Sequence, residues 1–299
     1  MRPPTKAIIT DAGFASRYLP IAKTIPKGML PIGNRPIMQL VVEECVAAGI
    51  REIIIVATPE GKPIYEDYFN NAVNHVRKQL IAQGKAERYD VVREVLDFPK
   101  IRIITQDPAL PYGNGSPIVS ARDYIADDEA FVAIYSDDVV FGASDTKTLC
   151  EAFAKNPTAS AIIMAQEIAP DKVDRYGIIS LKDGNKLDNI VEKPSIRHAP
   201  SHLASYGRYL LTPAVFNYLR PNMTSLDDEL WTVDAITKMA AHGDVLVVKT
   251  HGEWMTTGDP KNYFLAHLKH VLDSEDYAGD VYEFLRERSV ADNKSEKLA

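Results

Sequence analysis

The chain has 299 residues, of which 45% are hydrophobic and 25% are charged, a composition typical of a soluble globular protein. Its formal net charge of −7 excludes a chain-wide positive field that would attract nucleic acid or anionic membranes. Two cysteines are too few for a disulfide framework, and no apolar run is long enough for a signal peptide or a membrane span. These properties favour a cytoplasmic enzyme or binding protein without a nucleic-acid or membrane partner.

Strand-like apolar runs alternate with helical patterns through the first half of the chain. The runs are rich in β-branched residues and lie at 6–10, 52–58, 101–105 and 130–136. Such nearly continuous apolar runs indicate strands that are buried on both faces, as in a parallel sheet with helices on each side. The chain between them is long enough for helical crossovers.

Two helical regions are predicted between these strands. The first covers residues 36–49, with Pro36 at the first helical position and Gly49 just beyond the helix end. The second is a charge-rich insertion, about 62–98, which predicts two surface helices. The insertion is compatible with either a lid or an interface.

The second half of the chain mixes strands and helices. Strands are predicted at 159–168, 176–182, 187–194 and 206–212, and helices near 228–242 and 260–275. Asp183-Gly184 lies between two strand-like runs and predicts a hairpin. The tail 277–299 is expected to be partly helical and then disordered, so we expect one domain over 1–276 followed by this tail.

The stretch "DAGFASRYLP" (11–20) follows the first strand and contains candidate phosphate ligands. In open parallel sheets, a small-residue turn at a strand's carboxyl end lets backbone N–H groups approach phosphates. Gly13 permits that approach, Ser16 adds a hydroxyl, Arg17 adds a cationic fork, and Lys27 follows in a proline-stiffened loop. The alternative is an ordinary connection with two solvated cations. Neither common glycine-rich phosphate fingerprint occurs.

"IYSDDVVFG" places Asp137 and Asp138 at the end of an apolar strand. A carboxylate there can hold Mg²⁺ through one oxygen while substrate phosphates occupy other coordination positions. The alternative is a pair of turn or helix-capping aspartates. No H-E-x-x-H, paired C-x-x-C or G-x-S-x-G motif occurs, which excludes the usual zinc-hydrolase and serine-esterase signatures.

Two further strand ends carry polar residues. Gln106 precedes a second small-residue loop, "PYGNGSPIV", and an amide can pair with a base edge by donating and accepting together. Glu192 and Lys193 are adjacent, so in a regular strand they would point to opposite faces unless the chain bends there. A plain turn and a surface ion pair are the alternatives.

Several stretches, taken in order, resemble the bacterial UTP–glucose-1-phosphate uridylyltransferases of the wider sugar-1-phosphate nucleotidyltransferase family. They are "AGFASRYLPIAKTIPKGMLPIGNRPIMQLVVEECVAAGI", "YSDDVV", "VEKP", "YGRYLL" and "DELWTVDAI", and the match extends over about residues 5–272. The stretch "LPIAKTIPKGMLPIGNRPI" resembles the uridylyl type rather than the thymidylyl type. The resemblance implies a Rossmann-like three-layer α/β/α fold with a mixed, mainly parallel central sheet. It also implies Mg²⁺-dependent formation of UDP-glucose and pyrophosphate from UTP and glucose 1-phosphate.

The same resemblance implies roles for individual residues and an assembly. Those matching nucleotide and metal positions are Ala12, Gly13 and Ser16 at the nucleotide, Gln106 and Gly113 near the uracil, Arg17 and Lys27 at the triphosphate, and Asp137 at the magnesium ion. Those matching the sugar and its phosphate are Gly177, Glu192 and Lys193. Family members commonly form dimers or tetramers, so a homo-oligomer is expected.

The chain departs from the family pattern in the first loop. The family reads G-x-G-T-R where this chain has "GFASR", so Ala15 replaces a glycine and Ser16 replaces a threonine. Alanine disfavours a positive φ, so the loop is strained if the backbone at Ala15 is left-handed. Gly28 stands where the family usually has glutamate.

The most consequential departure is Thr256, which stands where the family carries a second aspartate. A hydroxyl is a weaker magnesium ligand than a carboxylate, and Asp138 or Asp259 is a candidate to compensate. Two alternatives accompany the uridylyltransferase hypothesis. The departures in the loops at 13–16 and 111–117 leave open the same chemistry with another sugar 1-phosphate or nucleoside triphosphate, and Thr256 and Ala15 leave open a non-catalytic sugar-nucleotide-binding protein.

Overall fold

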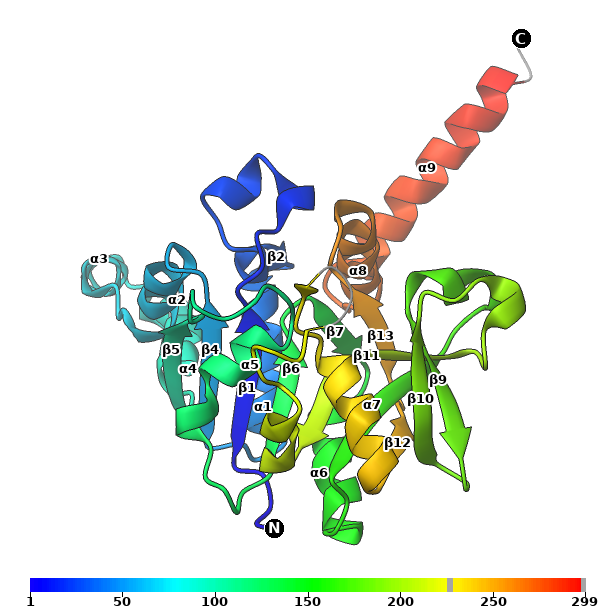
Figure 1. Ribbon diagram of the computed structural model, residues 1–299. Coiled ribbons are helices and arrows are strands. Elements are labelled where there is room, and N and C mark those ends of the chain that lie inside the picture. The colour runs from blue at the N-terminus through cyan, green and yellow to red at the C-terminus, as the bar shows by residue number, and fades with distance from the viewer. Residues whose placement is uncertain (225–227, 297–299) are drawn as a thin grey trace.

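The computed structural model describes residues 1–224 and 228–296, with side chains as far as Arg288, and its centre is a nine-stranded sheet (Figure 1). Across the sheet the order is β5 (Lys100–Thr105), β4 (Glu52–Ala57), β1 (Lys6–Asp11), β6 (Phe131–Tyr135), β11 (Leu203–Leu211), β8 (Ala161–Glu167), β12 (Val245–Lys249), β10 (Lys186–Glu192) and β9 (Gly177–Lys182). β1 lies between β4 and β6, so the carboxyl end of the first strand is flanked by those of two others.

The sheet is mixed, and most of its strands run in one direction. β5, β4, β1 and β6 are parallel to one another, and β8 is parallel to β12. β11 is antiparallel to β6 and β8, and β10 is antiparallel to β12 and β9. All strands of this sheet except β10 and β11 therefore share a direction, which confirms the mixed, mainly parallel sheet.

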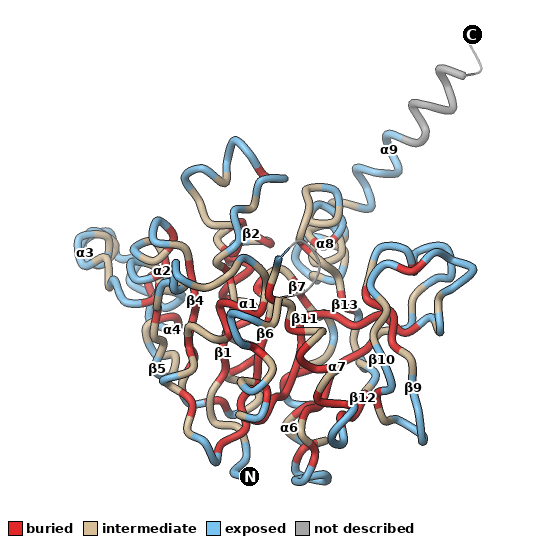
Figure 2. The backbone as a smooth tube through the Cα atoms, viewed as in Figure 1, coloured by how far each residue is buried: buried red, intermediate tan, exposed pale blue. Residues whose placement is uncertain are grey.

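Helices cover both faces of the sheet. On one face the core includes residues of α1 (Ile37–Ala47), α2 (Gly61–Asn70), α4 (Asp90–Leu96) and α6 (Asp145–Lys155). On the other it includes residues of α5 (Ser116–Ser120) and α7 (Thr232–His242). Successive β1 residues alternate between the two cores, as a strand requires, with Ile9 in the first and Ile8 in the second. Figure 2 shows the buried residues concentrated along the strands, and the three-layer α/β/α prediction is confirmed.

The insertion and the first helix differ in detail from the sequence prediction. The first predicted surface helix is two helices, α2 and α3 (Asn74–Ala82), because the chain turns at residues 71–73. The Asn71 side chain accepts a hydrogen bond from the Val73 N–H at 2.9 Å, and Val73 has a left-handed φ of 37°. Pro36 caps α1 from just outside it, whereas Gly49, with φ of 83°, ends the helix as predicted.

Smaller elements complete the molecule. β7 (Asp138–Phe141) pairs with β13 (Glu253–Thr256), and β2 (Pro31–Ile32) pairs with β3 (Arg35–Pro36). The hairpin predicted at Asp183-Gly184 joins β9 and β10, and both turn residues have positive φ. Short 3-10 turns occupy Ser16–Tyr18, Ile21–Lys23, Lys27–Met29, Ala86–Tyr89, Arg122–Tyr124, Pro170–Arg175, Ile196–His198 and Pro213–Asn217.

The C-terminal segment is more helical than predicted. α8 (Pro260–Leu272) packs beside β13, and α9 (Ala278–Glu296) projects from the body (Figure 1). The predicted tail ends in residues 297–299, which lie outside the described residues. Within the described segments, no helix is both long and apolar enough to cross a membrane.

Candidate active site

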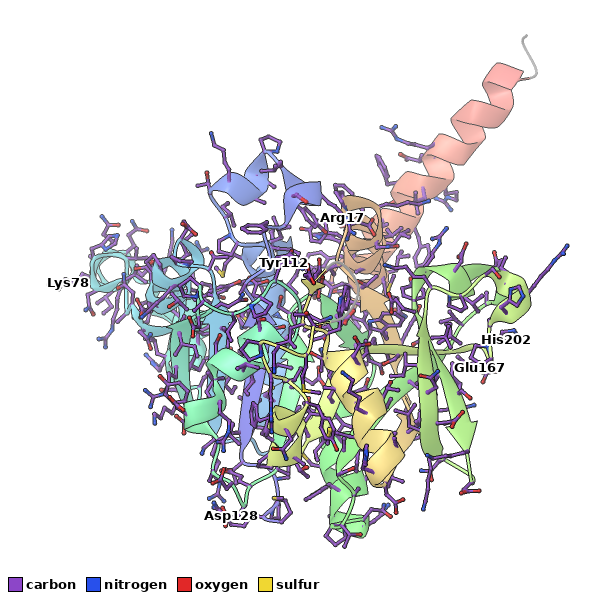
Figure 3. The ribbon with its side chains drawn as sticks, in the orientation of Figure 1. Arg17, Lys78, Tyr112, Asp128, Glu167 and His202 are labelled. Carbon is purple, nitrogen blue, oxygen red and sulfur yellow. The ribbon has the colours of Figure 1, made fainter. Side chains whose placement is uncertain are left out.

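The predicted site residues gather where the parallel strands end. Asp11 ends β1, Gln106 follows β5, and Asp137 follows β6, so three loops meet at one edge of the sheet. Figure 3 shows Arg17 and Tyr112 at this edge, whereas Asp128 lies at the opposite edge. Ligands of open α/β sheets bind at such an edge, beyond the carboxyl ends of the strands.

Two cavities open at this edge. The first, which we call the Gln106 cavity, measures about 280 Å³. The second, the Lys193 cavity, measures about 500 Å³ and lies toward β9 and β10. Both are lined by Asn114, Tyr135, Asp137 and Trp231, so the two cavities adjoin at Asp137.

Ten of the eleven predicted site residues line these cavities. Those of the Gln106 cavity are Ala12, Gly13, Lys27, Gln106, Gly113 and Asp137. Those of the Lys193 cavity are Arg17, Asp137, Gly177, Glu192 and Lys193. Ser16 is exposed in the turn Ser16–Tyr18 and lines neither cavity, so the structure does not bring its hydroxyl to the others.

Lys27 and Asp137 form an ion pair between the two cavities. The Lys27 Nζ donates to Asp137 Oδ2 at 2.6 Å, and both side chains are partly buried. Burial opposes the charge on each group, yet Lys27 holds the pKa of the Asp137 carboxyl below its usual value. Asp137 and Asp11 in turn keep the pKa of Lys27 raised despite its burial. Both groups therefore stay charged where an anionic substrate and a cation would meet.

Asp138 is a structural residue at the back of the site. Its Oδ1 accepts a hydrogen bond from the Trp254 indole at 2.7 Å, and its Oδ2 accepts one from the Gly207 N–H at 2.8 Å. Burial first, and then the charge of Asp137, raise the pKa of Asp138 to about 6. Both oxygens of Asp138 are therefore engaged, in contrast to the candidate compensating role predicted for it.

A buried arginine supports the same turn from behind. Arg208 on β11 is fully buried, and its Nη2 donates to the Asp138 carbonyl at 2.6 Å and to Glu44 Oε2 at 3.0 Å. Its Nη1 donates to the carbonyls of Tyr135 and Gly207 at 3.3 and 3.1 Å. A buried guanidinium needs such partners, and here they fix the backbone on both sides of Asp137.

Thr256 faces the space beside Asp137. A Cβ built on Gly258 would lie 3.2 Å from both Asp137 Oδ2 and Thr256 Oγ1, so these oxygens flank one small space. Asp259 caps α8, with its oxygens accepting from the Asn262 N–H at 3.0 Å and the Asn262 amide at 2.5 Å. No three His, Cys, Asp or Glu side chains cluster as metal ligands in the described part of the chain. One carboxylate with a neighbouring hydroxyl fits Mg²⁺, which takes one or two carboxylates and completes its shell with phosphates and water.

The small-residue loop, residues 12–17, contains a strained alanine. Ala15 has φ of 47° and ψ of 38°, which is the left-handed region. The missing glycine therefore matters, because an L-residue pays about 1–2 kcal/mol in this conformation. The next turn directs Arg17 so that its Nη1 donates to the Gly258 carbonyl at 3.4 Å.

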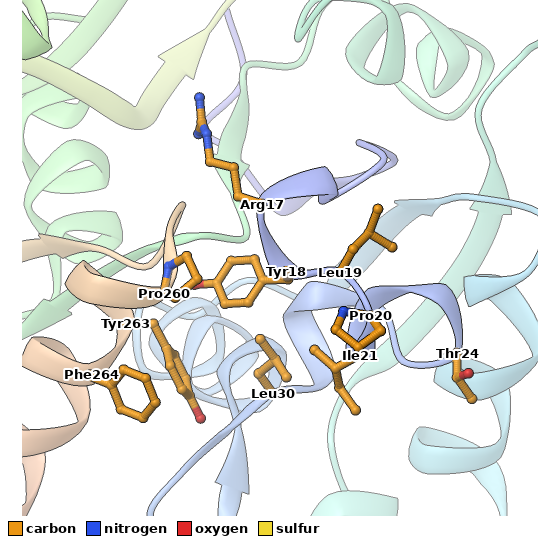
Figure 4. Close-up of a pocket in the computed structure, with 10 residues that line it drawn as sticks. All are labelled: Arg17, Tyr18, Leu19, Pro20, Ile21, Thr24, Leu30, Pro260, Tyr263 and Phe264. Atoms are coloured by element: carbon orange, nitrogen blue, oxygen red, sulfur yellow. The ribbon is translucent and has the colours of Figure 1, made fainter.

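Arg17 and Tyr18 point to different places. Figure 4 shows Tyr18 among the side chains of an apolar cavity of about 490 Å³, with Leu30, Pro260 and Tyr263, while the Arg17 guanidinium points away from them. The Tyr18 hydroxyl donates to the Thr257 carbonyl at 2.5 Å, which ties this loop to the chain after β13. That anchor leaves Arg17 free to line the Lys193 cavity.

The buried carboxyl group of Asp11 lies next to Gly28, the glycine that stands where the family usually has glutamate. Asp11 accepts hydrogen bonds from the Tyr65 hydroxyl, from Ser136 Oγ at 2.6 Å and from the Gly28 N–H at 3.4 Å. A Cβ on Gly28 would lie 2.5 Å from the Tyr65 hydroxyl and 3.2 Å from Asp11 Oδ2. Asp11 and Tyr65 therefore fill the space that a side chain at 28 would need. Burial raises the pKa of the Asp11 carboxyl, and Lys27 opposes that rise.

Two further backbone positions shape the cavities. Gly113 has φ of 127°, and a Cβ there would lie 2.4 Å from the Leu230 carbonyl, so only glycine fits. Lys193 has a left-handed φ of 45°, so the chain does bend after Glu192. The bend brings both side chains into the Lys193 cavity, where their charged groups lie 3.4 Å apart.

Sequence reasoning missed several lining residues. Asn114 and Tyr112 were within a stretch already recognised, but their roles depend on contacts with the distant segment 229–232. Asn114 Oδ1 accepts from the Thr232 N–H at 2.8 Å and so joins the loop to the start of α7. Arg175 and Trp254 also line the Lys193 cavity, and no local motif marks either of them.

Comparison with known proteins places this geometry in context. A family model described as "Nucleotidyl transferase" matches residues 6–271. The chain is 33% identical over 292 residues to a UTP–glucose-1-phosphate uridylyltransferase of Staphylococcus epidermidis, covering 95% of this chain and 98% of that protein. A Bacillus subtilis protein of the same name is 33% identical over 290 residues, covering 95% and 97%.

Solved structures agree with these relatives. A UTP-bound UGPase from Acinetobacter baumannii superposes with a TM-score of 0.83 at 25% identity, covering 95% of this chain and 99% of that one. A UDP-glucose pyrophosphorylase in complex with UDP-glucose superposes with a TM-score of 0.75 at 28% identity, covering 89% and 98%. The similarity therefore extends over most of the chain.

Proposed function

The chain belongs to the nucleotidyl transferase family, and we propose that it makes UDP-glucose and pyrophosphate from UTP and glucose 1-phosphate. The observation that carries the proposal is the pair of adjoining cavities that meet at Asp137. Such an arrangement holds a nucleotide and a sugar phosphate side by side at the end of the sheet. The named activity of the curated relatives supports the choice of substrates.

The reaction is an in-line displacement at the α-phosphorus of UTP. A phosphate oxygen of glucose 1-phosphate forms the new P–O bond, and the bond to the bridging oxygen of pyrophosphate breaks. The sugar phosphate is already anionic at neutral pH, so no general base is needed. The protein has to hold two mutually repelling anions in line and offset their charge.

The residues lining the two cavities suit this task. Arg17, from the small-residue loop, and Lys27, from the turn Lys27–Met29, would bind the triphosphate. Lys193, with Arg175 as an additional cation, would bind the sugar phosphate from the other side. These local cations explain how a chain of net charge −7 can bind two phosphorylated substrates.

The remaining assignments follow the shapes of the cavities. Gln106 and Gly113 would contact the uracil, and Ala12 and Gly13 would contact other parts of the nucleotide. Gly177 and Glu192 would contact the sugar hydroxyls, because a carboxylate accepts hydrogen bonds from them. Ser16 has no assigned contact because its hydroxyl lies outside both cavities.

Asp137 would hold Mg²⁺ through one oxygen, with Thr256 as a weaker neutral neighbour. When bound, the ion offsets the charge that develops on the departing pyrophosphate. Lys27 already neutralises Asp137, so it must share that carboxylate with the ion or turn toward the nucleotide phosphates. Either way, Lys27 and Asp137 act as one unit.

The test is to incubate the protein with UTP, Mg²⁺ and glucose 1-phosphate and to measure UDP-glucose and pyrophosphate. We expect turnover, with loss of activity when the metal is chelated. Absence of pyrophosphate across a range of sugar 1-phosphates would overturn the proposal. UDP-glucose binding without turnover at high Mg²⁺ would instead identify the non-catalytic binding protein.

The left-handed Ala15 favours a second candidate, the same reaction with a different nucleotide. Alanine at position 15 changes the loop that would contact the nucleotide phosphates. The loop around Gly113, on the side proposed for the base, also departs from the common family pattern. Turnover of UTP, dTTP, CTP and GTP, measured side by side, separates the two. A preference for any nucleotide other than UTP would support the second candidate.

We also propose a domain organisation, an assembly and a location for the enzyme. Residues 1–276 form the nucleotidyltransferase domain, with the insertion at about 62–98, and 277–299 form an appended tail. The projecting α9 and the insertion are surfaces for a homodimer or homotetramer (Figure 1). Small soluble phosphorylated substrates suit a cytoplasmic location without nucleic-acid or membrane partners.

A further inference from the structure

Two aromatic rings, those of Phe14 and Tyr112, stack at the edge of the Gln106 cavity. Phe14 belongs to the small-residue loop after β1, and Tyr112 belongs to the loop before α5. Their ring centroids are 5.7 Å apart and their planes differ by 8°, which is an offset parallel stack. Residues almost 100 positions apart in the chain thus connect the two small-residue loops of the site.

Both rings are unusually open to solvent for a packed pair. Phe14 is 75% exposed and Tyr112 is 52% exposed, so the stack leaves much apolar surface uncovered. The pair therefore contributes little burial of its own to folding. Exposed aromatic surface at the rim of a binding cavity is typical of ligand contact.

The two rings have different neighbours. Tyr112 lines the Gln106 cavity, together with Gln106 and Gly113. Phe14 instead lines a smaller neighbouring cavity of about 190 Å³, with Lys23 and Lys27. Tyr112 thus lies on the base side of the site, and Phe14 stacks on it from the phosphate side.

The backbone around both rings is held in place. Ala15, directly after Phe14, is left-handed, and Gly113, directly after Tyr112, is pressed against Leu230. The Tyr112 carbonyl also accepts a hydrogen bond from the Leu230 N–H at 2.7 Å. These constraints position the rings before any ligand arrives, which lowers the entropic cost of binding.

We propose that Tyr112 is the stacking platform for the nucleobase and that Phe14 is a positioning residue that backs it. This inference rests on the proposed function, because it takes the Gln106 cavity as the base site. Every nucleobase has a π-face, so stacking raises affinity for all nucleotides alike. Discrimination between bases then belongs to hydrogen bonding at Gln106, and the aromatic pair sets affinity without setting base choice.

The test measures nucleotide dissociation constants by calorimetry, together with KM and kcat. Tyr112→Ala is expected to weaken UTP binding about tenfold, the range for loss of one base–aromatic stack. It should raise KM by a similar factor and leave kcat within about threefold, because the platform binds ground state and transition state alike. Tyr112→Phe keeps the ring face and should bind UTP as the unaltered protein does.

A double-mutant cycle separates the roles of the two rings. Phe14→Ala alone should weaken UTP binding about threefold, and Phe14→Ala/Tyr112→Ala should weaken it no more than Tyr112→Ala. The same factors should apply to dTTP, CTP and GTP wherever they bind. Tyr282→Ala, which removes an exposed tyrosine on α9 outside both cavities, serves as the matched control and should leave the UTP dissociation constant unchanged.

The outcomes distinguish this inference from the proposed function. Unchanged UTP affinity in Tyr112→Ala overturns the platform, even if the unaltered protein turns over UTP. If the two substitutions weaken UTP binding multiplicatively in the double variant, Phe14 does not act through Tyr112. If Tyr112→Ala weakens binding of the four nucleotides by different factors, the aromatic pair does contribute to base choice. Failure of the unaltered protein to bind any of the four nucleotides overturns both proposals.

Discussion

The acidic turn, Asp137–Asp138, and the small-residue loop, residues 12–17, both contribute to the Gln106 cavity. Their conformations are stabilised in different ways. Buried polar contacts fix the acidic turn. Arg208 donates to the Asp138 carbonyl, and the Trp254 indole donates to the Asp138 carboxylate. The small-residue loop is largely exposed, and its path depends on one left-handed alanine. One wall of the site is therefore fixed by the core, and the other by local backbone conformation.

This difference suits the two tasks of a nucleotidyl-transfer site. A carboxylate that carries a metal must keep its position through every cycle, so deep support is appropriate. A loop that follows phosphates has to admit and release a nucleotide, which favours few buried contacts. Lys27, from the turn Lys27–Met29, pairs with Asp137 of the acidic turn.

The largest expected effect comes from breaking the Lys27–Asp137 ion pair at the acidic turn. Lys27→Ala and Asp137→Ala should each lower kcat about 10²–10³-fold, because each removes a charge aimed at the reacting phosphates. Circular dichroism and thermal unfolding should confirm an intact fold. Lys62→Ala, which removes a half-exposed lysine paired with Glu66 on α2, is the control and should retain activity. Near-normal rates in either cleft variant would contradict the assignment.

The next effect tests the buried support of the acidic turn. Arg208→Met should lower the free energy of unfolding by about 3–5 kcal/mol, because Glu44, whose side chain is 10% exposed, loses its ion pair with Arg208. Adding Glu44→Gln to this variant should recover part of the loss, since the second change removes that charge. Urea unfolding measures both. A loss below about 1 kcal/mol for Arg208→Met would mean that the network is not a structural support.

A smaller effect tests the magnesium site proposed at Asp137. Thr256→Asp places a second carboxylate beside Asp137 and should tighten Mn²⁺ binding about tenfold without nucleotide. Electron paramagnetic resonance of free Mn²⁺ measures this directly, with no need for turnover. Thr256→Asn is the neutral control of similar shape. Equal affinities of the two variants would show that the charge lost at this position is unimportant.

The smallest effect tests strain in the small-residue loop. Ala15→Gly should raise the free energy of unfolding by about 0.5–1 kcal/mol, because glycine adopts the left-handed conformation without steric cost. Ala12→Gly is the matched control, since Ala12 has no positive φ, and it should be neutral or slightly destabilising. Chemical unfolding compares the two. A destabilised Ala15→Gly variant would mean that the alanine methyl makes a favourable contact.

Local patterns were sufficient for the architecture. The apolar runs that became β1, β4 and β6 are continuous, so burial on both faces follows from the side chains alone. Arg102 interrupts the run that became the edge strand β5, which is only partly buried. Turn chemistry likewise predicted the β9–β10 hairpin at Asp183-Gly184 and the end of α1 at Gly49. The insertion was less predictable, because the break at Val73 is marked by a hydrogen bond from the Val73 N–H to the Asn71 side chain rather than by a proline or glycine.

The sequence by itself determined the fold class, the strand ends that carry polar residues and, through resemblance, the candidate residues of the site. Only the tertiary structure decided which of them meet. It excluded Ser16 from both cavities, engaged Asp138 and Asp259 in structural hydrogen bonds, and paired Phe14 with Tyr112. The physical reason is that strand and turn formation depend on neighbours in the chain, whereas these contacts join segments brought together only when the sheet assembles.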